Sequence, residues 1–516
     1  MPTATTPQLA EVLLAAAARG PDRLACVGPD AVTYGDLERR VAATTADVRE
    51  VARPGDRVAL IAGNEVGFLV AYLATLRAGC VAALLNGTSP SHELARELHT
   101  VAPRLVLASP AYEDLASRAA GRTTAPVSVI VVDPSHASDP DAVPCVPRDP
   151  GDLAVLMFTA GTGGAPRPAM LTHGSLIANL EQMQSHPGLK LTADDVALGI
   201  LPLFHIYGLN VVAGLALRAG AALSLVEHFH PAETIARVRA DGVTVIAAVP
   251  SIFEAWLALE AATAPADAFA RVRLCVSGAA ALAPETVRGM YERFGLHVHN
   301  GYGLTEASPA VTTTAVEAVL RPDSIGPPLP GVEIRLVDVD GNDALAGDPG
   351  EIWVRGANVF AGYWNDAAAS ETALADGWLH TGDIAVADDN GWLTLVDRAK
   401  DIIIVSGFNV YPGEVEAVLR THPDVAEVAV VGEPHPRTGE AVAAFVVPRD
   451  KRELDPVELV RFGARRLARY KLPTRVEVLD ELPRTLAGKV LRRELSSEET
   501  STARTRRPPD ATTNPA

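Results

Sequence analysis

A glycine-rich segment at residues 158–173 is the first stretch that could do chemistry, and it reads FTAGTGGAPRPAMLTH. Glycines let successive backbone N–H groups turn toward an anion without clashes from side chains. The hydroxyls of Thr159 and Thr162 and the guanidinium of Arg167 add donors and a positive charge. We therefore predict a loop that holds a polyphosphate, although it lacks the GK[ST] of a Walker A loop and a plain surface turn is the alternative. The backbone donors expected there are those of Gly161, Gly163 and Gly164.

A second stretch, at residues 300–306, reads NGYGLTE and suits a nucleotide and its metal. The ring of Tyr302 is flanked by two glycines and can lie flat against a purine. Thr305 offers a hydroxyl to a phosphate, and Glu306 offers a carboxylate to Mg²⁺. The alternative is an ordinary turn before a helix, with Thr305 as its cap. The nucleotide-binding residues expected here are Asn300, Gly301, Tyr302 and Gly303.

Two further groups suit a ribose. Asp383, in the run WLHTGD, has a carboxylate that can accept hydrogen bonds from two adjacent ribose hydroxyls, and Arg398, in DRAKD, can add a donor. Taken singly, each is more often a solvated loop or surface residue.

These segments need a rigid frame, and the sequence around them alternates short apolar runs with amphipathic helices. Apolar strands separated by helices favour an α/β fold of parallel sheets covered by helices. Strand 153–158 is expected to enter the glycine-rich loop, and a helix at 174–184 is expected to leave it. From residue 331 to 354 the pattern changes to short strands with tight turns, which predicts a small barrel-like part. Other expected strands are 57–61, 81–85, 104–108 and 127–132.

The pattern predicts two domains. A large N-terminal domain would cover residues 1–399, and a small α+β domain, expected to be mobile, would cover residues 400–496. Residues 497–516 are polar and include three prolines, so we expect a disordered tail.

Charge and composition exclude several functions. The net charge of −18 argues against binding to nucleic acid or attraction to an anionic membrane, and it means that an anionic ligand needs local basic groups. No apolar run reaches membrane-spanning length, and no signal-peptide pattern opens the sequence. The cysteines are too far apart for a zinc site or a disulfide framework, which favours reduced thiols and a cytoplasmic protein. They are Cys26, Cys80, Cys145 and Cys275.

The glycine-rich segment resembles the signature loop of the adenylate-forming superfamily, which includes acyl-CoA synthetases, aryl-CoA ligases, luciferases and amino-acid adenylation domains. The usual form of that loop is [YF]TSGTTGxPKGVxxTH. Here Ala160 and Gly163 remove two hydroxyls, and Arg167 replaces a lysine. Pro168 removes a backbone donor and favours an extended conformation of Arg167. With the motifs at residues 300–306, 383 and 398 in the family's order, the resemblance covers about residues 8–496.

The resemblance implies roles for residues that the chemistry alone does not single out. The run SGAAAL at 277–282 is similar to a loop whose backbone approaches the adenine. Alanines stand at 279 and 281, so we expect Gly278 to carry most of this loop's flexibility. Its adenine-binding residues would be Gly278, Ala279 and Ala280.

In the smaller domain, the resemblance implies that Lys489 is the catalytic lysine. Its ammonium would bridge the attacking carboxylate and the α-phosphate. Lys400 would be the hinge between the domains. The residues implied to line the path of the CoA pantetheine are Ser406, Gly407 and Phe408.

The acid substrate is expected to bind near the run LPLFHIYGL at 201–209. Relatives that activate amino acids place an aspartate directly after the phenylalanine, whereas this chain has His205. Apolar neighbours favour an aliphatic or aromatic acid, and small residues at 279 and 280 would permit a deep pocket. The expected acyl pocket is formed by Phe204, His205, Tyr207 and Phe253, with Val249 and Trp256 as further walls or as core residues.

We therefore predict an ATP-dependent acyl-CoA synthetase that uses Mg²⁺ and CoA and acts on a medium- or long-chain fatty acid through an acyl-adenylate. The catalytic residues would be Lys489, Thr305, Glu306 and Arg167. Three alternatives remain: an aryl-acid CoA ligase, a ligase that loads an acyl carrier protein, and a non-catalytic nucleotide-binding homologue.

Overall fold

The computed structural model describes residues 8–124, 127–133, 135–159, 166–316, 321–398, 401–405, 408–449, 454–484 and 490–496. The chain divides into two compact units. The larger unit comprises residues 1–346, 352–381 and 387–394, and the smaller unit comprises residues 347–351, 382–386 and 395–516.

The first sheet of the larger unit has eight strands in the order β14-β13-β12-β11-β9-β10-β1-β2. Neighbours from β13 to β1 pair in parallel, whereas β14 and β2, at the two edges, run antiparallel to their neighbours. Every residue of β10 and β11 is buried, as expected for strands covered on both faces. The strands are β1 (Leu24–Val27), β2 (Val32–Thr33), β9 (Val196–Gly199), β10 (Ala222–Leu225), β11 (Val245–Ala248), β12 (Leu274–Ser277), β13 (His299–Gly303) and β14 (Ala310–Thr313).

The second sheet has six strands in the order β6-β5-β3-β4-β7-β8. Its first five strands are parallel, and β8 is antiparallel to β7. The predicted parallel α/β architecture is thus confirmed. The strands are β3 (Arg57–Ile61), β4 (Val81–Leu84), β5 (Leu105–Ala108), β6 (Ser128–Val131), β7 (Leu153–Thr159) and β8 (Arg167–Thr172).

The helix expected at 174–184 is confirmed as α6, which begins at His173, but the sequence analysis did not predict the strand β8 that lies between the glycine-rich loop and this helix. The strand forms because it can pair on both sides: with β7, and with residues 361–364, where the N–H of Met170 donates to the carbonyl of Gly362 at 2.9 Å. That second partner lies almost two hundred residues away in the sequence, so local periodicity could not indicate it.

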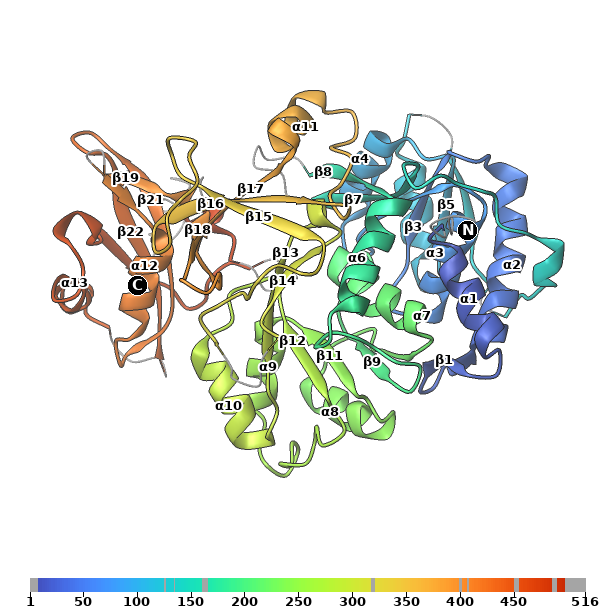
Figure 1. Cartoon of the computed structure of the whole chain (residues 1–516), viewed down its shortest axis with the longest axis horizontal. Coiled ribbons are helices and arrows are strands. Elements are labelled where there is room, and N and C mark those ends of the chain that lie inside the picture. Colours follow the sequence, from blue (N-terminus) through green and yellow to red (C-terminus); the bar gives the residue numbers. More distant parts are fainter. Residues whose placement is uncertain are drawn as a thin grey trace, which may run out of the picture. The chain divides into compact units, whose positions relative to one another are not determined.

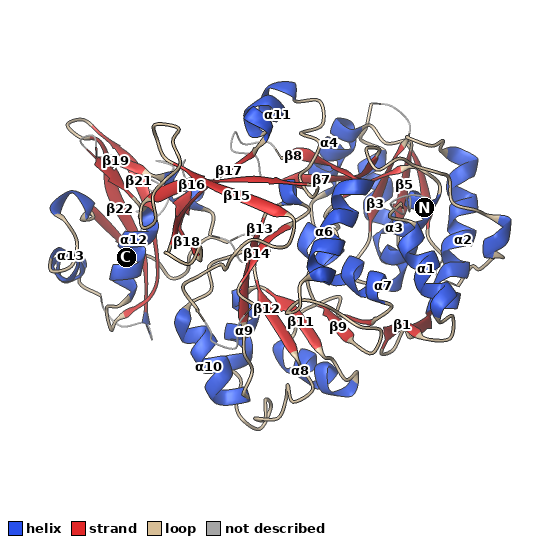
Figure 2. Ribbon diagram, in the orientation of Figure 1, coloured by secondary structure: helices blue, strands red, loops and turns tan. Residues whose placement is uncertain are grey.

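Helices cover both sheets (Figure 2). The helix α3 is buried at each of its residues and is apolar except for Thr75 and Arg77 near its end, which is typical of a helix packed between layers. The helices of the larger unit are α1 (Glu11–Arg19), α2 (Tyr34–Val51), α3 (Val66–Arg77), α4 (Ser91–Val101), α5 (Glu113–Ala120), α6 (His173–Ser185), α7 (Leu215–Ala219), α8 (Pro231–Ala240), α9 (Pro250–Leu257), α10 (Pro284–Phe294) and α11 (Ala367–Ala373). A π-helical stretch, η3 (Tyr207–Gly214), precedes α7.

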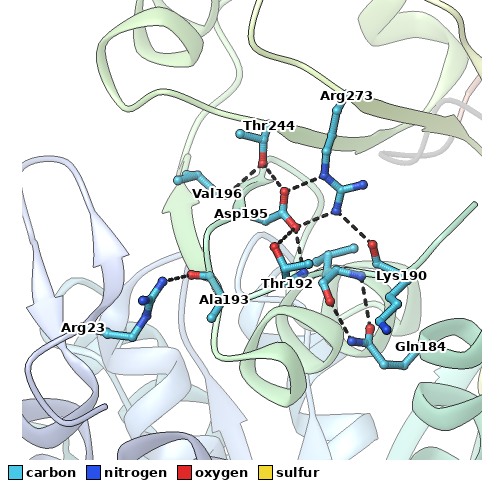
Figure 3. A network of polar contacts seen from close by, with 10 residues as sticks. Arg23, Gln184, Lys190, Thr192, Ala193, Asp195, Val196, Thr244 and Arg273 are labelled. Carbon is cyan, nitrogen blue, oxygen red and sulfur yellow. Dashed lines mark hydrogen bonds and ion pairs between the residues drawn. The ribbon is translucent and has the colours of Figure 1, made fainter. Parts of the chain in front are cut away.

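A buried polar network lies at the amino end of β9 (Figure 3). The Asp195 side chain is 4% exposed, and its two oxygens accept hydrogen bonds from Arg273 Nε at 2.7 Å and Nη2 at 2.6 Å. The Thr244 hydroxyl and the Thr192 N–H also donate to it, at 2.8 and 2.7 Å. Asp195 thereby joins the loop before β9 to the starts of β11 and β12.

A third, four-stranded sheet has the order β15-β16-β17-β18. It supplies the strands expected after residue 331. The division between the two units passes within three of its strands, because short pieces of β16, β17 and β18 belong to the smaller unit. The strands are β15 (Val332–Val337), β16 (Pro349–Gly356), β17 (Leu379–Ala387) and β18 (Leu393–Arg398).

The smaller unit is an α+β structure with its own core. Its sheet has the order β20-β19-β22-β21, and β23 pairs in parallel with β22. The helix α12 packs on β21 and buries Val415 and Leu419 against the sheet (Figure 1). The elements are β19 (Ile403–Val405), β20 (Phe408–Val410), α12 (Pro412–Arg420), β21 (Val425–His435), β22 (Gly439–Pro448), α13 (Pro456–Ala464), β23 (Arg475–Val478) and α14 (Arg492–Ser496).

All four cysteines are free thiols, as predicted. Burial raises the pKa of Cys26 to about 12 and the pKa of Cys80 to about 11. A thiol with such a pKa carries almost no thiolate at neutral pH and is therefore unreactive.

Candidate active site

The carboxyl ends of β9, β11, β12 and β13 lie at one edge of the first sheet, because these neighbouring strands are parallel (Figure 1). The segments expected to bind the acid and the adenine leave the sheet at this edge, after β9 and β12, and β13 carries the NGYG residues. In open α/β sheets, ligands bind outside the carboxyl ends of the strands. The topology therefore brings the predicted acid and adenine segments together.

Asn64 holds in place the loop after β9, residues 201–209, which is expected to bind the acid and is called the acid-side loop below. Its Nδ2 donates to the carbonyls of Gly199 at 3.3 Å and Leu201 at 2.8 Å, and its Oδ1 accepts from the N–H of Leu203 at 2.9 Å. The side chain is 9% exposed. One amide from the segment after β3 thus satisfies three backbone groups of the loop after β9. The sequence analysis did not identify it.

Tyr207 packs against Gly278 in the loop after β12, residues 278–282, which is expected to bind the adenine and is called the adenine-side loop below. A Cβ added to Gly278 would lie 3.2 Å from two ring carbons and from the hydroxyl oxygen of Tyr207. The Tyr207 hydroxyl lies 3.4 Å from the carbonyl of Val276, and burial raises the pKa of Tyr207. Gly278 is therefore needed for the close approach of an aromatic ring.

The left-handed backbone of this loop belongs to Ala279, which corrects the expectation that Gly278 supplies the flexibility. Ala279 has a φ of 67°. This conformation costs an alanine about 1 kcal/mol relative to a glycine. Ala279 is exposed and Ala280 is half-buried. A strained alanine thus stands next to Gly278 in this loop.

His205 is a neutral imidazole. The N–H of Tyr207 donates to its Nδ1 at 3.2 Å, which places the proton on Nε2, and burial lowers the pKa of His205 below its usual range. The acid-side loop therefore offers no charged partner at this position for a substrate ammonium.

The predicted pocket residues differ in exposure. Phe204 is half-buried, whereas Phe253 and Trp256 are both fully buried. The rings of Phe253 and Trp256 meet edge to face at 5.8 Å, and Trp256 also contacts Phe269 at 5.1 Å. Phe253 and Trp256 therefore belong to an aromatic core cluster, and an acyl chain would reach them only if that cluster opened.

The NGYG residues lie on β13. Asn300 is held by the protein, since its Nδ2 donates to the Ser324 carbonyl at 3.0 Å. Tyr302 is 8% exposed. Gly303 has a steric reason to be glycine, because a Cβ there would lie 2.2 Å from the Pro309 carbonyl oxygen. Gly301 stands between Asn300 and Tyr302 and pairs with Thr313 of β14.

Thr305 and Glu306 begin a short 3₁₀ turn, η4 (Thr305–Ala307), one residue after β13 ends. The hydroxyl of Tyr363 donates to Glu306 Oε1 at 2.7 Å, and the N–H of Phe360 donates to the Glu306 carbonyl at 2.9 Å. Burial, together with the nearby Glu306 carboxylate, raises the pKa of Tyr363, so Tyr363 is the proton donor in this pair. The sequence analysis did not single out Tyr363.

The two ends of the glycine-rich loop are fixed by the β7–β8 hairpin. Thr159 pairs with Arg167, and its hydroxyl donates to the Arg167 carbonyl at 3.3 Å. Arg167 is extended, as predicted from Pro168, and its Nε lies 2.9 Å from Asp366 Oδ2. Both partners of this ion pair are about one-third exposed. Gly161, Thr162, Gly163 and Gly164 lie outside the described residues.

The remaining predicted residues belong to the smaller unit. Asp383 lies in β17 and is 6% exposed, next to Gly382, whose N–H donates to the Glu351 carboxylate at 2.9 Å. Arg398 ends β18, and Phe408 begins β20, where it pairs with Val405. The predicted residues outside the described ones are Lys400, Ser406, Gly407 and Lys489.

None of the helices in the described part of the chain combines the length and the apolar character needed to cross a membrane.

Comparison with protein families shows which family the chain belongs to. A family model described as AMP-binding enzyme matches residues 13–364, and one described as AMP-binding enzyme C-terminal domain matches residues 414–489. The long-chain-fatty-acid–CoA ligase of Yersinia pestis is 36% identical, with 91% of this chain and 90% of the relative covered. Feruloyl-CoA synthase of an Amycolatopsis species is also 36% identical, with 91% of this chain and 94% of the relative covered.

Solved structures agree with these matches. ATP-bound MatB from Rhodopseudomonas palustris is similar to this chain with a TM-score of 0.87 and 31% identity, and the match covers 96% of this chain and 99% of that protein. The first family model spans more than half of the sequence, and both sequence relatives extend over most of it. This chain therefore belongs to the AMP-binding enzyme family, the adenylate-forming superfamily that its motifs resemble.

Proposed function

We propose that the chain is an ATP-dependent, AMP-forming acyl-CoA synthetase whose acid is a medium- or long-chain fatty acid. One observation carries the choice of acid: the loop after β9 is uncharged at His205, and its own Tyr207 ring packs on Gly278. A substrate ammonium has no counterion at this position, whereas an apolar chain needs none. The Yersinia relative named a long-chain-fatty-acid–CoA ligase supports the same choice.

The reaction would have two steps. First, a carboxylate oxygen of the acid attacks the α-phosphorus of ATP, the bond from that phosphorus to the bridging oxygen of the β-phosphate breaks, and pyrophosphate leaves. Then the CoA sulfur loses its proton and attacks the acyl carbonyl carbon, the bond from this carbon to the phosphate oxygen breaks, and AMP leaves. Thr305 and Arg167 would stabilise the negative charge in the first step, together with Lys489 of the smaller unit.

Glu306 fits a Mg²⁺ ion that accompanies the nucleotide. Mg²⁺ prefers hard oxygen ligands and is commonly held by one or two carboxylates plus substrate phosphates. A carboxylate has two oxygens, so the hydrogen bond from Tyr363 to Oε1 still leaves Oε2 for a cation. When bound, the ion would neutralise charge on the phosphates.

The smaller unit would serve both half-reactions in turn, with Lys400 as the hinge, Lys489 acting in adenylation and residues 406–408 acting in thioester formation. Such an exchange lets one nucleotide site serve two reactions. Asp383 and Arg398 would hold the ribose. CoA is the proposed acceptor, and an acyl carrier protein is the alternative. A cytoplasmic location remains a prediction.

The aryl-acid alternative has its own support, because feruloyl-CoA synthase is as similar to this chain as the fatty-acid ligase is. A pyrophosphate-release assay separates the two, with purified chain, ATP, Mg²⁺, CoA and one acid at a time from acetate, octanoate, palmitate, ferulate and benzoate. We expect kcat/KM to be highest with octanoate or palmitate. A preference for ferulate or benzoate would favour the aryl alternative, and a preference for acetate would remove the fatty-acid proposal.

A further inference from the structure

Residues 360–366 contact both Glu306, which the proposed function assigns to the metal, and Arg167, which it assigns to the phosphates. On one side, the Phe360 N–H and the Tyr363 hydroxyl bind Glu306, as described above. On the other side, Asp366 pairs with Arg167. This short segment therefore connects the expected metal ligand to the expected phosphate-binding cation.

The segment is itself rigidly held. The carbonyl of Met170 on β8 accepts from the N–H of Ala361, and the carbonyl of Pro168 accepts from the N–H of Trp364, at 2.9 and 2.8 Å. The Phe360 side chain is 3% exposed, and its ring meets the Tyr363 ring edge to face at 5.0 Å. The Tyr363 ring is thus fixed by backbone pairing and by packing, so its hydroxyl reaches the carboxylate from a defined direction.

We propose that Tyr363 is a positioning residue for the metal: its hydroxyl orients the Glu306 carboxylate so that Oε2 faces the Mg²⁺ of the nucleotide complex. The inference rests on the proposed function, because it needs a nucleotide with its metal at Glu306. A residue that orients a metal ligand typically accounts for a factor of about 10 to 100 in metal affinity. The donor here is a neutral hydroxyl, so we expect the lower end of that range.

The test is nucleotide binding and not turnover. Isothermal titration calorimetry measures the affinity for an ATP analogue with a methylene bridge between the α- and β-phosphates, at a series of free Mg²⁺ concentrations, in the full chain and in Tyr363→Phe. The variant keeps the ring and removes only the hydroxyl. We expect it to need about 10-fold more free Mg²⁺ to reach half of the metal-dependent gain in affinity. Its affinity in EDTA should equal that of the unchanged chain.

Tyr34→Phe is the matched control. It also removes a buried tyrosine hydroxyl, which donates to the Ala221 carbonyl at 2.6 Å, but Tyr34 begins α2, directly after the edge strand β2. It should leave the Mg²⁺ dependence unchanged. In a Glu306→Ala background, Tyr363→Phe should have no further effect on the Mg²⁺ dependence, because the hydroxyl then has no carboxylate to orient.

Two results would overturn the proposal, and they differ. If the unchanged chain binds the analogue in a Mg²⁺-dependent way and Tyr363→Phe has the same dependence, the positioning role is wrong and the proposed function stands. If the unchanged chain binds no nucleotide at any Mg²⁺ concentration, the proposed function fails, and the role of Tyr363 fails with it.

Discussion

The buried carboxylate of Asp195 gives a prediction that can be worked out from its contacts. Burial alone would raise its pKa, but the hydrogen bonds from Arg273, the Thr192 N–H and the Thr244 hydroxyl outweigh burial and lower the pKa from 3.8 to about 2. The folded state of the larger unit therefore stabilises the ionised form of the Asp195 carboxyl relative to its protonated form. Asp195→Asn removes the charge and keeps nearly the same shape.

The size of the effect follows from the two pKa values. At about 1.4 kcal/mol for each pKa unit, a fall from 3.8 to about 2 corresponds to about 2.5 kcal/mol of stability at pH 7. Because the folded pKa is the lower one, this contribution is complete above the unfolded value and is lost as the pH falls toward the folded value. We expect roughly half of it to remain at pH 3.

Urea unfolding followed by tryptophan fluorescence is the assay. The five tryptophans are all in the larger unit, so their fluorescence reports the unit that contains Asp195. Asp195→Asn should lower the free energy of unfolding by about 2.5 kcal/mol at pH 7, and the difference from the unchanged chain should shrink as the pH falls below 4.

The neighbouring Asp194 supplies the control. Its ion pair with Arg23 is exposed, since the two side chains are 90% and 46% exposed. Exposed pairs contribute about 0–1 kcal/mol, so Asp194→Asn should have little effect. If the two variants lost equal stability, or if the loss in Asp195→Asn stayed constant down to pH 3, the reasoning from the network of hydrogen bonds would be wrong.

Three further predictions concern the candidate site. Lys489→Ala should slow adenylation at least about 100-fold and spare thioester formation from supplied acyl-AMP; equal loss of both half-reactions, measured separately, would contradict its role. Ala279→Gly should raise the free energy of unfolding by about 0.5 kcal/mol, because relief of the left-handed alanine outweighs the greater freedom of the unfolded chain, and a lower urea midpoint would contradict this. Gly303→Ala should destabilise the larger unit by at least about 2 kcal/mol and reduce adenylation, since its Cβ would overlap a backbone oxygen; Gly151→Ala, in open space, is the control, and equal midpoints for the two variants would contradict the steric argument.

The sequence predicted the parallel sheets and most strand positions because buried parallel strands are continuous apolar runs. The strand at 57–61 agrees with β3 to the residue, and the helix at 174–184 agrees with α6 to within one residue at each end. The sequence also predicted Thr305 and Glu306 as chemical groups, since a contiguous motif carries them. The sequence could not predict which residues position these two side chains.

The residues missed by sequence reasoning bind partners far away in the chain. Asn64 and the loop residue Leu203 are separated by 139 positions, and Tyr363 and Glu306 by 57. No local pattern marks either pair. The strand β8 was missed for the same reason, and the strain at Ala279 follows from a backbone angle that composition does not reveal.

The division of the third sheet has a practical consequence for protein engineering. The smaller unit is assembled from three separate stretches, because residues 347–351 and 382–386 belong to it as well as the segment from 395 onward. A gene fragment that begins near residue 400 would encode the C-terminal family domain but omit these two pieces. An exchange of the smaller unit between two family members would therefore have to include residues 347–351 and 382–386, so that these parts of the divided strands stay with the unit to which they belong.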